Sequence, residues 1–201
     1  MAIAPSFCGV ILAAGESSRM GQEKALLTYR GATLLGGAIE SLRPHTEMVV
    51  VVAGKNADAI SPVVYAAGAF LIVNPAPERG QFSSLQVGLR EVLNRGRDGA
   101  IILLVDRPAA ERETVGQLRQ AFLEKSAEGI WAVAPEYSGR HGHPIVVGRE
   151  MMEAFLKAPA TSSARDVKNS LPGRVAYVPV DDPLVAMNVN TPEDYARLTA
   201  T

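Results

Sequence analysis

Short apolar runs alternate with amphipathic stretches along almost the whole chain. The apolar runs are rich in β-branched residues and stop at glycine, proline or a polar residue, which is typical of strands that are buried on both faces of a parallel sheet. We predict seven such strands, over residues 7–14, 48–53, 69–73, 100–105, 130–134, 144–147 and 174–180.

The stretches between these runs carry helical periodicity. Residues 33–42, 57–67, 83–94, 111–125, 150–157 and 191–199 are predicted helices, and residues 161–166 open a further short one. Strands that alternate with helices predict right-handed crossovers, so the fold class is α/β, a three-layer α/β/α domain with a mostly parallel, Rossmann-like sheet. Residues 137–144 interrupt the alternation and predict an inserted loop or hairpin over the rim of the sheet.

Length and composition indicate one domain over residues 1–201. With 47% hydrophobic residues the chain can fill a core, and its 18 glycines and 13 prolines lie at element ends rather than in one linker.

The number of Lys and Arg residues (20) nearly equals the number of Asp and Glu residues (21), which argues against a nucleic-acid partner. One cysteine, Cys8, fits a reducing compartment. Because we find neither a signal peptide nor a span of about 20 apolar residues, we predict a cytoplasmic protein with no membrane partner.

The clearest indication of a ligand-binding site is the loop after the first strand, which reads L-A-A-G-E-S-S-R-M-G-Q-E-K over residues 12–24. Ligands of open α/β sheets bind outside the carboxyl ends of the strands, and small residues let backbone N–H groups approach phosphate oxygens. Arg19 and Lys24 add two cations, which together suggest a polyphosphate. The alternative is an ordinary glycine-rich turn with solvated charges. The loop has neither the G-x-x-x-x-G-K-[ST] nor the G-x-G-x-x-G pattern, so a P-loop kinase and a Rossmann dehydrogenase do not fit.

Two further loops follow later strands. Gly80, Ser83 and Ser84 open a helix and are placed to contact the base or ribose, although Ser83 could simply cap that helix. Asp106 follows an apolar strand, where its carboxylate suits Mg²⁺; as a cap for the helix at Glu111 it would come too early.

Polar residues of the second half supply a candidate acceptor site. His141 and His143 flank Gly142, and polar lining of a pocket is a better interpretation than a metal site because no third ligand lies at helpful spacing. Asn188 and Asn190 share one face of an extended segment, just before a helix start at residues 191–194.

The segment L-A-A-G-x-S-x-R-M-G-x-x-K resembles the signature loop of nucleotidyltransferases with the MobA-like fold, which include the molybdenum-cofactor cytidylyl- and guanylyltransferases and share the nucleotide-diphospho-sugar transferase type of fold. The resemblance implies an NTP whose triphosphate is neutralised by Arg19 and Lys24, both assigned to catalysis with Asp106. The implied nucleotide contacts are Leu12, Ala13, Ala14, Gly15, Ser17, Arg19, Met20, Gly21, Lys24, Gly80, Ser83 and Ser84.

The same resemblance extends to the metal and the acceptor. Asp106 with Pro108 matches the family's Asp-x-Pro metal site, and Asn190 is the implied second ligand of Mg²⁺. Acceptor contacts are implied for Arg107, His141, His143 and Asn188. Arg107 stands where cofactor cytidylyltransferases often carry glutamine, so the resemblance does not fix the identity of the acceptor.

These features predict a Mg²⁺-dependent transferase that moves CMP from CTP onto a phosphorylated acceptor, with molybdopterin implied by the resemblance, and releases pyrophosphate. A molybdoenzyme or its chaperone is the implied protein partner. Ala13-Ala14 and Ser83-Ser84-Leu85 resemble the cytidylyl branch, whereas Asn188-Val189-Asn190 resembles the guanylyl branch. A sugar-1-phosphate or other small-acceptor nucleotidyltransferase and a non-catalytic nucleotide-binding regulator remain alternatives.

Overall fold

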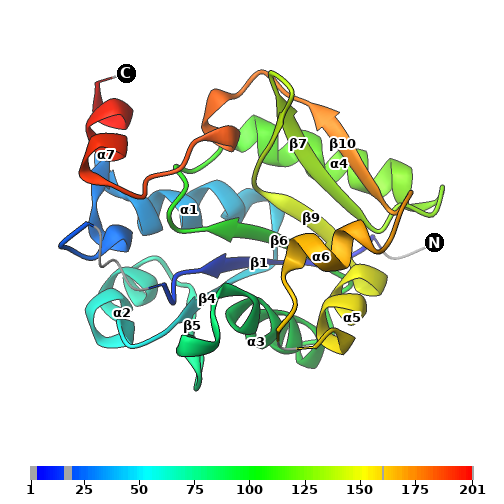
Figure 1. Cartoon of the computed structure of the whole chain (residues 1–201), viewed down its shortest axis with the longest axis horizontal. Helices are drawn as coiled ribbons and strands as arrows, with labels where there is room; N and C mark the ends of the chain where they lie inside the picture. Colours follow the sequence, from blue (N-terminus) through cyan, green and yellow to red (C-terminus); the bar gives the residue numbers. More distant parts are fainter. Residues whose placement is uncertain (1–3, 16–19, 160, 201) are drawn as a thin grey trace.

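The computed structural model describes residues 4–15, 20–159 and 161–200, so the predicted contacts Ser17 and Arg19 lie outside the described residues. Its main sheet has eight strands: β1 (Phe7–Leu12), β4 (Met48–Ala53), β5 (Phe70–Val73), β6 (Gly99–Leu104), β7 (Ala132–Tyr137), β8 (Arg140–His141), β9 (Ile145–Gly148) and β10 (Val175–Pro179). Their order is β10-β7-β9-β6-β1-β4-β5, with β8 paired to β7. Only β8 and β9 run antiparallel to their neighbours, which confirms a mostly parallel sheet (Figure 1).

Helices cover both faces of this sheet. α1 (Leu34–Leu42), α2 (Ala57–Ala66) and α4 (Arg112–Ser126) pack on one face, and α3 (Gln81–Asn94), α5 (Arg149–Lys157) and α6 (Ala164–Asn169) pack on the other. A small hairpin of β2 (Thr28–Tyr29) and β3 (Ala32–Thr33) precedes α1, and α7 (Pro192–Thr199) closes the chain. The α/β/α layering is therefore as the sequence predicts.

The central strand β1 shows why its residues form a continuous apolar run. Phe7 and Ile11 point into the core beneath α1 and α4, while Cys8, Val10 and Leu12 point into the core beneath α3. Successive side chains of a strand alternate between faces, so a strand covered on both sides needs apolar residues at every position. Phe7 meets Phe122 of α4 edge to face, with the ring centroids 5.9 Å apart.

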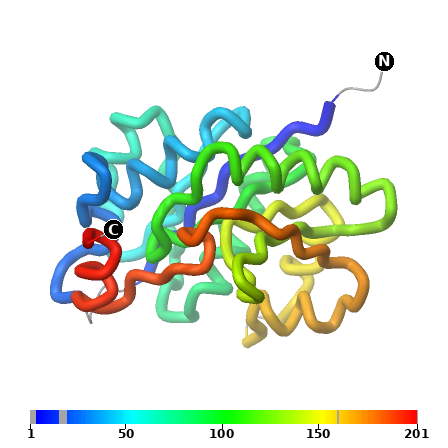
Figure 2. The backbone as a smooth tube through the Cα atoms, turned by 90° about the horizontal axis from the view of Figure 1, so that it is seen from above, coloured from blue at the N-terminus to red at the C-terminus, as the bar shows by residue number. Residues whose placement is uncertain are grey.

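The C-terminal segment that leads into α7, and α7 itself, pack against earlier parts of the chain. The Val189 N–H donates to the Asp106 carbonyl at 2.7 Å, and the Tyr195 hydroxyl donates to the Thr28 carbonyl at 2.6 Å. Figure 2 shows this return, with the red C-terminal helix beside the blue segment that follows the first loop. A small core joins the two segments through Met20, Leu27, Leu34, Leu184, Val189 and Leu198. Among the described helices, none combines the length and apolar character needed to span a membrane.

Cys8 lies in the core, and burial raises the pKa of its thiol to about 12. A thiol must ionise to react as a nucleophile, so we expect the folded protein to resist a thiol-specific alkylating reagent at pH 8. Intact-mass analysis should find no adduct in buffer and one adduct in guanidinium chloride. Rapid alkylation of the folded protein would show that this core opens readily.

Candidate active site

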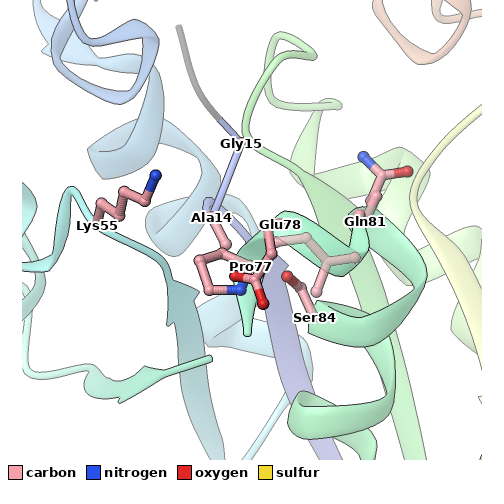
Figure 3. Close-up of a pocket in the computed structure, with 9 residues that line it drawn as sticks. Ala14, Gly15, Lys55, Pro77, Glu78, Gln81 and Ser84 are labelled. Carbon is pink, nitrogen blue, oxygen red and sulfur yellow. The ribbon is translucent and has the colours of Figure 1, made fainter. Parts of the chain in front are cut away.

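A cavity of about 430 Å³ lies at the carboxyl ends of β1 and β4. Its lining consists of Leu12, Ala14, Gly15, Lys55, Pro77, Glu78, Gly80, Gln81 and Ser84. Five of these residues, Leu12, Ala14, Gly15, Gly80 and Ser84, are nucleotide contacts predicted from the sequence. Figure 3 shows Lys55 and Gln81 on opposite sides of the cavity and Ser84 on α3. The cavity lies where an open α/β sheet is expected to bind its ligand.

The backbone of the first loop is fixed by the loop after β4. The Ala13 N–H donates to the Val52 carbonyl at 2.8 Å, and the Ala13 carbonyl accepts from Asn56 Nδ2 at 2.9 Å. A Cβ at Gly54 would lie 2.8 Å from the Ala14 carbonyl oxygen, so only glycine allows this close approach. Ala13 is thus buried in the wall behind the cavity and contributes its backbone to the wall's hydrogen bonds.

The start of α3 forms the opposite wall. Gly80, at φ +90°, is the N-cap of α3, so the capping role considered for Ser83 is wrong. The Ser83 hydroxyl instead donates to the Gly80 carbonyl at 2.7 Å and accepts from Asn74 Nδ2 at 2.9 Å. Asn74 also donates to the Ser84 hydroxyl at 3.0 Å, which fixes Ser84 on the cavity lining. Ser83 is buried behind this wall and does not line the cavity.

The segment that carries Asn190 runs beside Asp106 at the carboxyl end of β6. The Val189 N–H donates to the Asp106 carbonyl, and Lys24 Nζ donates to Asn190 Oδ1 at 2.9 Å. Asp106 Oδ1 is buried and has no hydrogen-bond partner within the described part of the chain. A buried carboxylate oxygen normally has a partner, so this atom marks a place for a cation or a donor from a ligand.

The donor set fits Mg²⁺. Carboxylate and amide oxygens are hard ligands, and Mg²⁺ usually takes one or two carboxylates together with substrate phosphates. Within the described ranges no group of three metal-ligating His, Cys, Asp or Glu residues occurs, so a site that takes its remaining ligands from a nucleotide and from water fits best. Asn190 Oδ1 keeps a second lone pair beside the one that accepts from Lys24.

Met20 and Gly21 support the first loop from outside the cavity. Met20 is buried in the small core under α7, and Gly21 makes a turn at φ +68°. Neither lines the cavity within the described part of the chain.

Three of the four predicted acceptor residues come together beyond Asp106. Arg107, His141 and His143 line a cavity of about 310 Å³ between the sheet and α6. Arg107 Nη1 donates to the Val185 carbonyl at 3.1 Å, and the His141 ring stacks on Tyr177 with the centroids 3.5 Å apart. Asn188 is exposed and lines neither this cavity nor the nucleotide-sized one.

The imidazole of His143 keeps an exposed edge, but its Nδ1 atom is buried and has no hydrogen-bond partner among the described residues. Burial, followed by the charges of Arg107 and Lys168, holds the pKa of His143 well below its usual value. The ring is therefore neutral at pH 7.

This shift predicts a pH dependence of stability. Between about pH 6.5 and the lower pKa of the folded state, the unfolded chain binds the His143 proton and the folded chain does not. The free energy of unfolding should therefore fall as the pH falls below about 6.5, by at most about 1.4 kcal/mol per pH unit from this residue. Urea unfolding at pH 7, 6 and 5 should give a shallower loss for His143→Gln than for the wild type. An unchanged loss in the variant would assign the dependence to other groups.

Several residues of the site were missed from the sequence. Lys55, Glu78 and Gln81 line the nucleotide-sized cavity, and Asn56 and Asn74 organise its walls. Asn74 directly follows a predicted strand and Lys55 is the second residue after one, and that position was a usable signal. Glu78 precedes the predicted helix by several residues, and no motif pointed to it.

Comparison with known proteins identifies the family. The family model described as "MobA-like NTP transferase domain" matches residues 9–175. The chain is 31% identical over 195 residues to a molybdenum cofactor guanylyltransferase from Cereibacter sphaeroides, covering 94% of this chain and 93% of the relative. It is 30% identical over 199 residues to nicotine blue oxidoreductase from Paenarthrobacter nicotinovorans (96% and 97% covered), and 24% identical over 187 residues to the molybdenum cofactor cytidylyltransferase of Escherichia coli (92% of each).

Solved structures agree with this assignment. Rv0371c from Mycobacterium tuberculosis H37Rv superposes with a TM-score of 0.80 at 28% identity, over 100% of both chains. A complex of Rv0371c with manganese gives a TM-score of 0.74 at 25% identity, over 98% of this chain and 99% of that one. The match of the family model over most of the chain, the named transferases among its relatives and the shared fold lead to one conclusion: this chain belongs to the MobA-like NTP transferase family and is a nucleotidyltransferase.

Proposed function

We propose that this protein is a Mg²⁺-dependent cytidylyltransferase that moves CMP from CTP onto the phosphate of molybdopterin and releases pyrophosphate. The observation that carries the proposal is the buried Oδ1 of Asp106, which has no hydrogen-bond partner among the described residues, next to the segment whose Asn190 pairs with Lys24. This cluster lies at the same edge of the sheet as the nucleotide-sized cavity and the acceptor-side cavity.

The reaction joins an acceptor phosphate oxygen to the α-phosphorus of CTP and breaks the bond between the α-phosphorus and the oxygen that bridges to the β-phosphate. The electron pair of that bond leaves with pyrophosphate. Arg19 and Lys24 bind the β- and γ-phosphates and neutralise the charge of the leaving group. Asp106 and Asn190 would hold the Mg²⁺ ion, which supplies charge neutralisation at the phosphates. An acceptor phosphate is already an anionic nucleophile, so the residues act mainly by position and charge.

The nucleoside is assigned to the cavity between the first loop and α3. Ala14, Gly15 and the first turn of α3 line it, and we assign the Ser84 hydroxyl and the Gln81 amide as side-chain partners of the nucleoside. Ala14 and Ser84 line this cavity, with Ala13 and Ser83 buried behind its walls, whereas Asn188–Asn190 belongs to the segment that bonds to Asp106. The segments that resemble the cytidylyl branch therefore lie nearest the cavity proposed for the nucleoside, which supports CTP.

We expect CTP to bind at least about tenfold more tightly than GTP, which needs about 1.4 kcal/mol. A site that matches the edge of one base leaves polar groups unpaired with another, at a cost of about 1–3 kcal/mol for each. Competition between the two nucleotides in Mg²⁺, followed by displacement of a fluorescent analogue, measures the ratio. Equal affinity or a preference for GTP would assign the chain to the guanylyl branch.

Molybdopterin as acceptor is supported by the names of the guanylyl- and cytidylyltransferase relatives. The proposal includes a cytoplasmic location and delivery of the product to a molybdoenzyme or its chaperone. One relative is named for an oxidoreductase activity, whereas the guanylyl- and cytidylyltransferase names of other relatives support transfer.

The product identifies the reaction. Mass spectrometry after incubation with CTP, Mg²⁺ and molybdopterin should show the cytidine dinucleotide form of the cofactor. Conversion of a sugar-1-phosphate in place of molybdopterin would favour the alternative acceptor class. Binding of CTP without any product would favour the non-catalytic regulator.

A further inference from the structure

The cavity beyond Asp106 is lined by an unusual concentration of cations. Arg107 reaches it from the end of β6, and Arg165 and Lys168 reach it from α6, with His143 and His141 on the sheet side. Asp166 is the acidic neighbour of Arg165 in the sequence. Its carboxylate accepts hydrogen bonds from the backbone N–H and the hydroxyl of Ser163, and Arg165 lines the cavity.

No acidic residue lines this cavity in the described part of the chain. Within the same residues, no carboxylate oxygen lies within 4.0 Å of a side-chain nitrogen of Arg107, Arg165 or Lys168. Glu136 pairs with the exposed His141 at 3.2 Å. Among the described residues, the three cations therefore line the cavity without a carboxylate in ion-pair contact, and Asp106 and Asp166 act on Arg107 and Arg165 only at longer range.

This arrangement is unfavourable without a counter-charge. Burial, and then the charge of Arg165, lowers the pKa of Lys168. Arg107 Nε is buried and has no hydrogen-bond partner among the described residues. Desolvated and unpaired charges are unfavourable unless a counter-charge accompanies them. An anion bound in the cavity would offset the desolvation cost of these cations and reduce the repulsion between Arg165 and Lys168.

An apolar cavity of about 290 Å³ adjoins the cationic one. It is lined by Phe82, Leu85 and Phe155 among others, and it shares His143, Ile145 and Lys168 with the cationic cavity. It also shares Leu12, Gly80 and Gln81 with the nucleotide-sized cavity. A molecule that lies along both cavities would place apolar surface against the phenylalanines and negative charge against α6.

We propose that Arg107, Arg165 and Lys168 bind an anionic group of the acceptor, and that the apolar cavity holds the acceptor's body. This inference rests on the proposed function, and it narrows the acceptor to a molecule with an apolar body and an anionic group. Lys168 borders both cavities and sets the position of the acceptor relative to the nucleotide. It is a positioning residue rather than a participant in bond making.

The first test uses inorganic phosphate as the probe and needs no turnover. The three histidines give separate imidazole signals in a ¹H–¹⁵N spectrum, and His45 serves as the internal control because it lies outside the cavity and bonds to the Arg112 carbonyl at 2.8 Å. At constant ionic strength, phosphate should shift the His143 and His141 signals and leave His45 unchanged. Absence of a His143 shift, or an equal shift of His45, would overturn the anion site.

Lys168→Met keeps the length of the side chain and removes its charge. We expect at least a tenfold loss of phosphate affinity in this variant, with an unfolding temperature in phosphate-free buffer no lower than that of the wild type. Lys157→Met, on the exposed side of α5, is the matched control and should bind phosphate as the wild type does. Wild-type affinity in Lys168→Met would contradict the proposal.

The second test separates this inference from the proposed function. With CTP and molybdopterin, Lys168→Met should raise the KM for the acceptor at least tenfold and leave the KM for CTP unchanged. If phosphate binds as described but no product forms with molybdopterin, the proposed acceptor is wrong while the anion site stands. If turnover proceeds with an unchanged acceptor KM in the variant, the anion site is wrong while the transferase stands.

Discussion

Replacing Asp106 by alanine or asparagine should lower turnover by at least about 1,000-fold, which corresponds to about 4 kcal/mol of transition-state stabilisation. Asp106 Oδ1 is buried and has no hydrogen-bond partner in the described part of the chain, and removing the carboxylate removes the proposed Mg²⁺ ligand. The remaining activity should no longer respond to added Mg²⁺. Steady-state pyrophosphate release across a Mg²⁺ titration measures both effects.

The fold should survive this substitution. The Asp106 backbone carbonyl, which accepts from Val189, is kept in every variant, and the lost Oδ1 atom has no partner among the described residues. Asp98→Asn is the matched control, because Asp98 flanks the other end of β6 and its carboxylate accepts from the Ser6 N–H at 2.8 Å. It should lower stability and leave turnover intact. Near-wild-type activity of Asp106→Ala in Mg²⁺ would show that the metal site is wrong.

Lys24→Ala and Arg19→Ala should weaken the binding of CTP by about 10- to 100-fold, because a hydrogen bond to a charged group contributes about 1.5–3 kcal/mol. Binding of CMP should change by less than about threefold, since a monophosphate lacks the terminal phosphates that these cations contact. Calorimetric titration of both nucleotides gives the two ratios. Lys157→Ala, which removes an exposed lysine from α5, controls for the loss of one positive charge. Equal losses for CTP and CMP would remove the triphosphate assignment of the first loop.

The layered fold could be predicted because its strands are buried on both faces. A strand such as β4 is an unbroken apolar run in the sequence, and in the helices between such runs the apolar residues recur with helical periodicity. The direction of β9 could not be predicted, because the same apolar residues serve a parallel or an antiparallel strand. The start of α3 at Gln81 was also missed, because glycine rather than a polar side chain caps this helix.

The cavity lining was predictable where short motifs lie in the connections after strands. Leu12, Ala14 and Gly15 line one cavity with Gly80 and Ser84, because β1 and β5 end at the same edge of the sheet. The pairing of Lys24 with Asn190 spans 166 positions and depends on the return of the C-terminal segment, which no local pattern reveals. The cations of α6 were equally hidden, since their common cavity depends on how α6 packs over the sheet.

Pyrophosphate release from CTP, GTP, ATP and UTP, each with and without molybdopterin, tests the account most directly. We expect release only when molybdopterin and Mg²⁺ are both present, with CTP ahead of GTP by at least about tenfold at limiting nucleotide. Chelation of the metal should stop the reaction. No release from any of the four nucleotides in the presence of molybdopterin and Mg²⁺ would contradict the account.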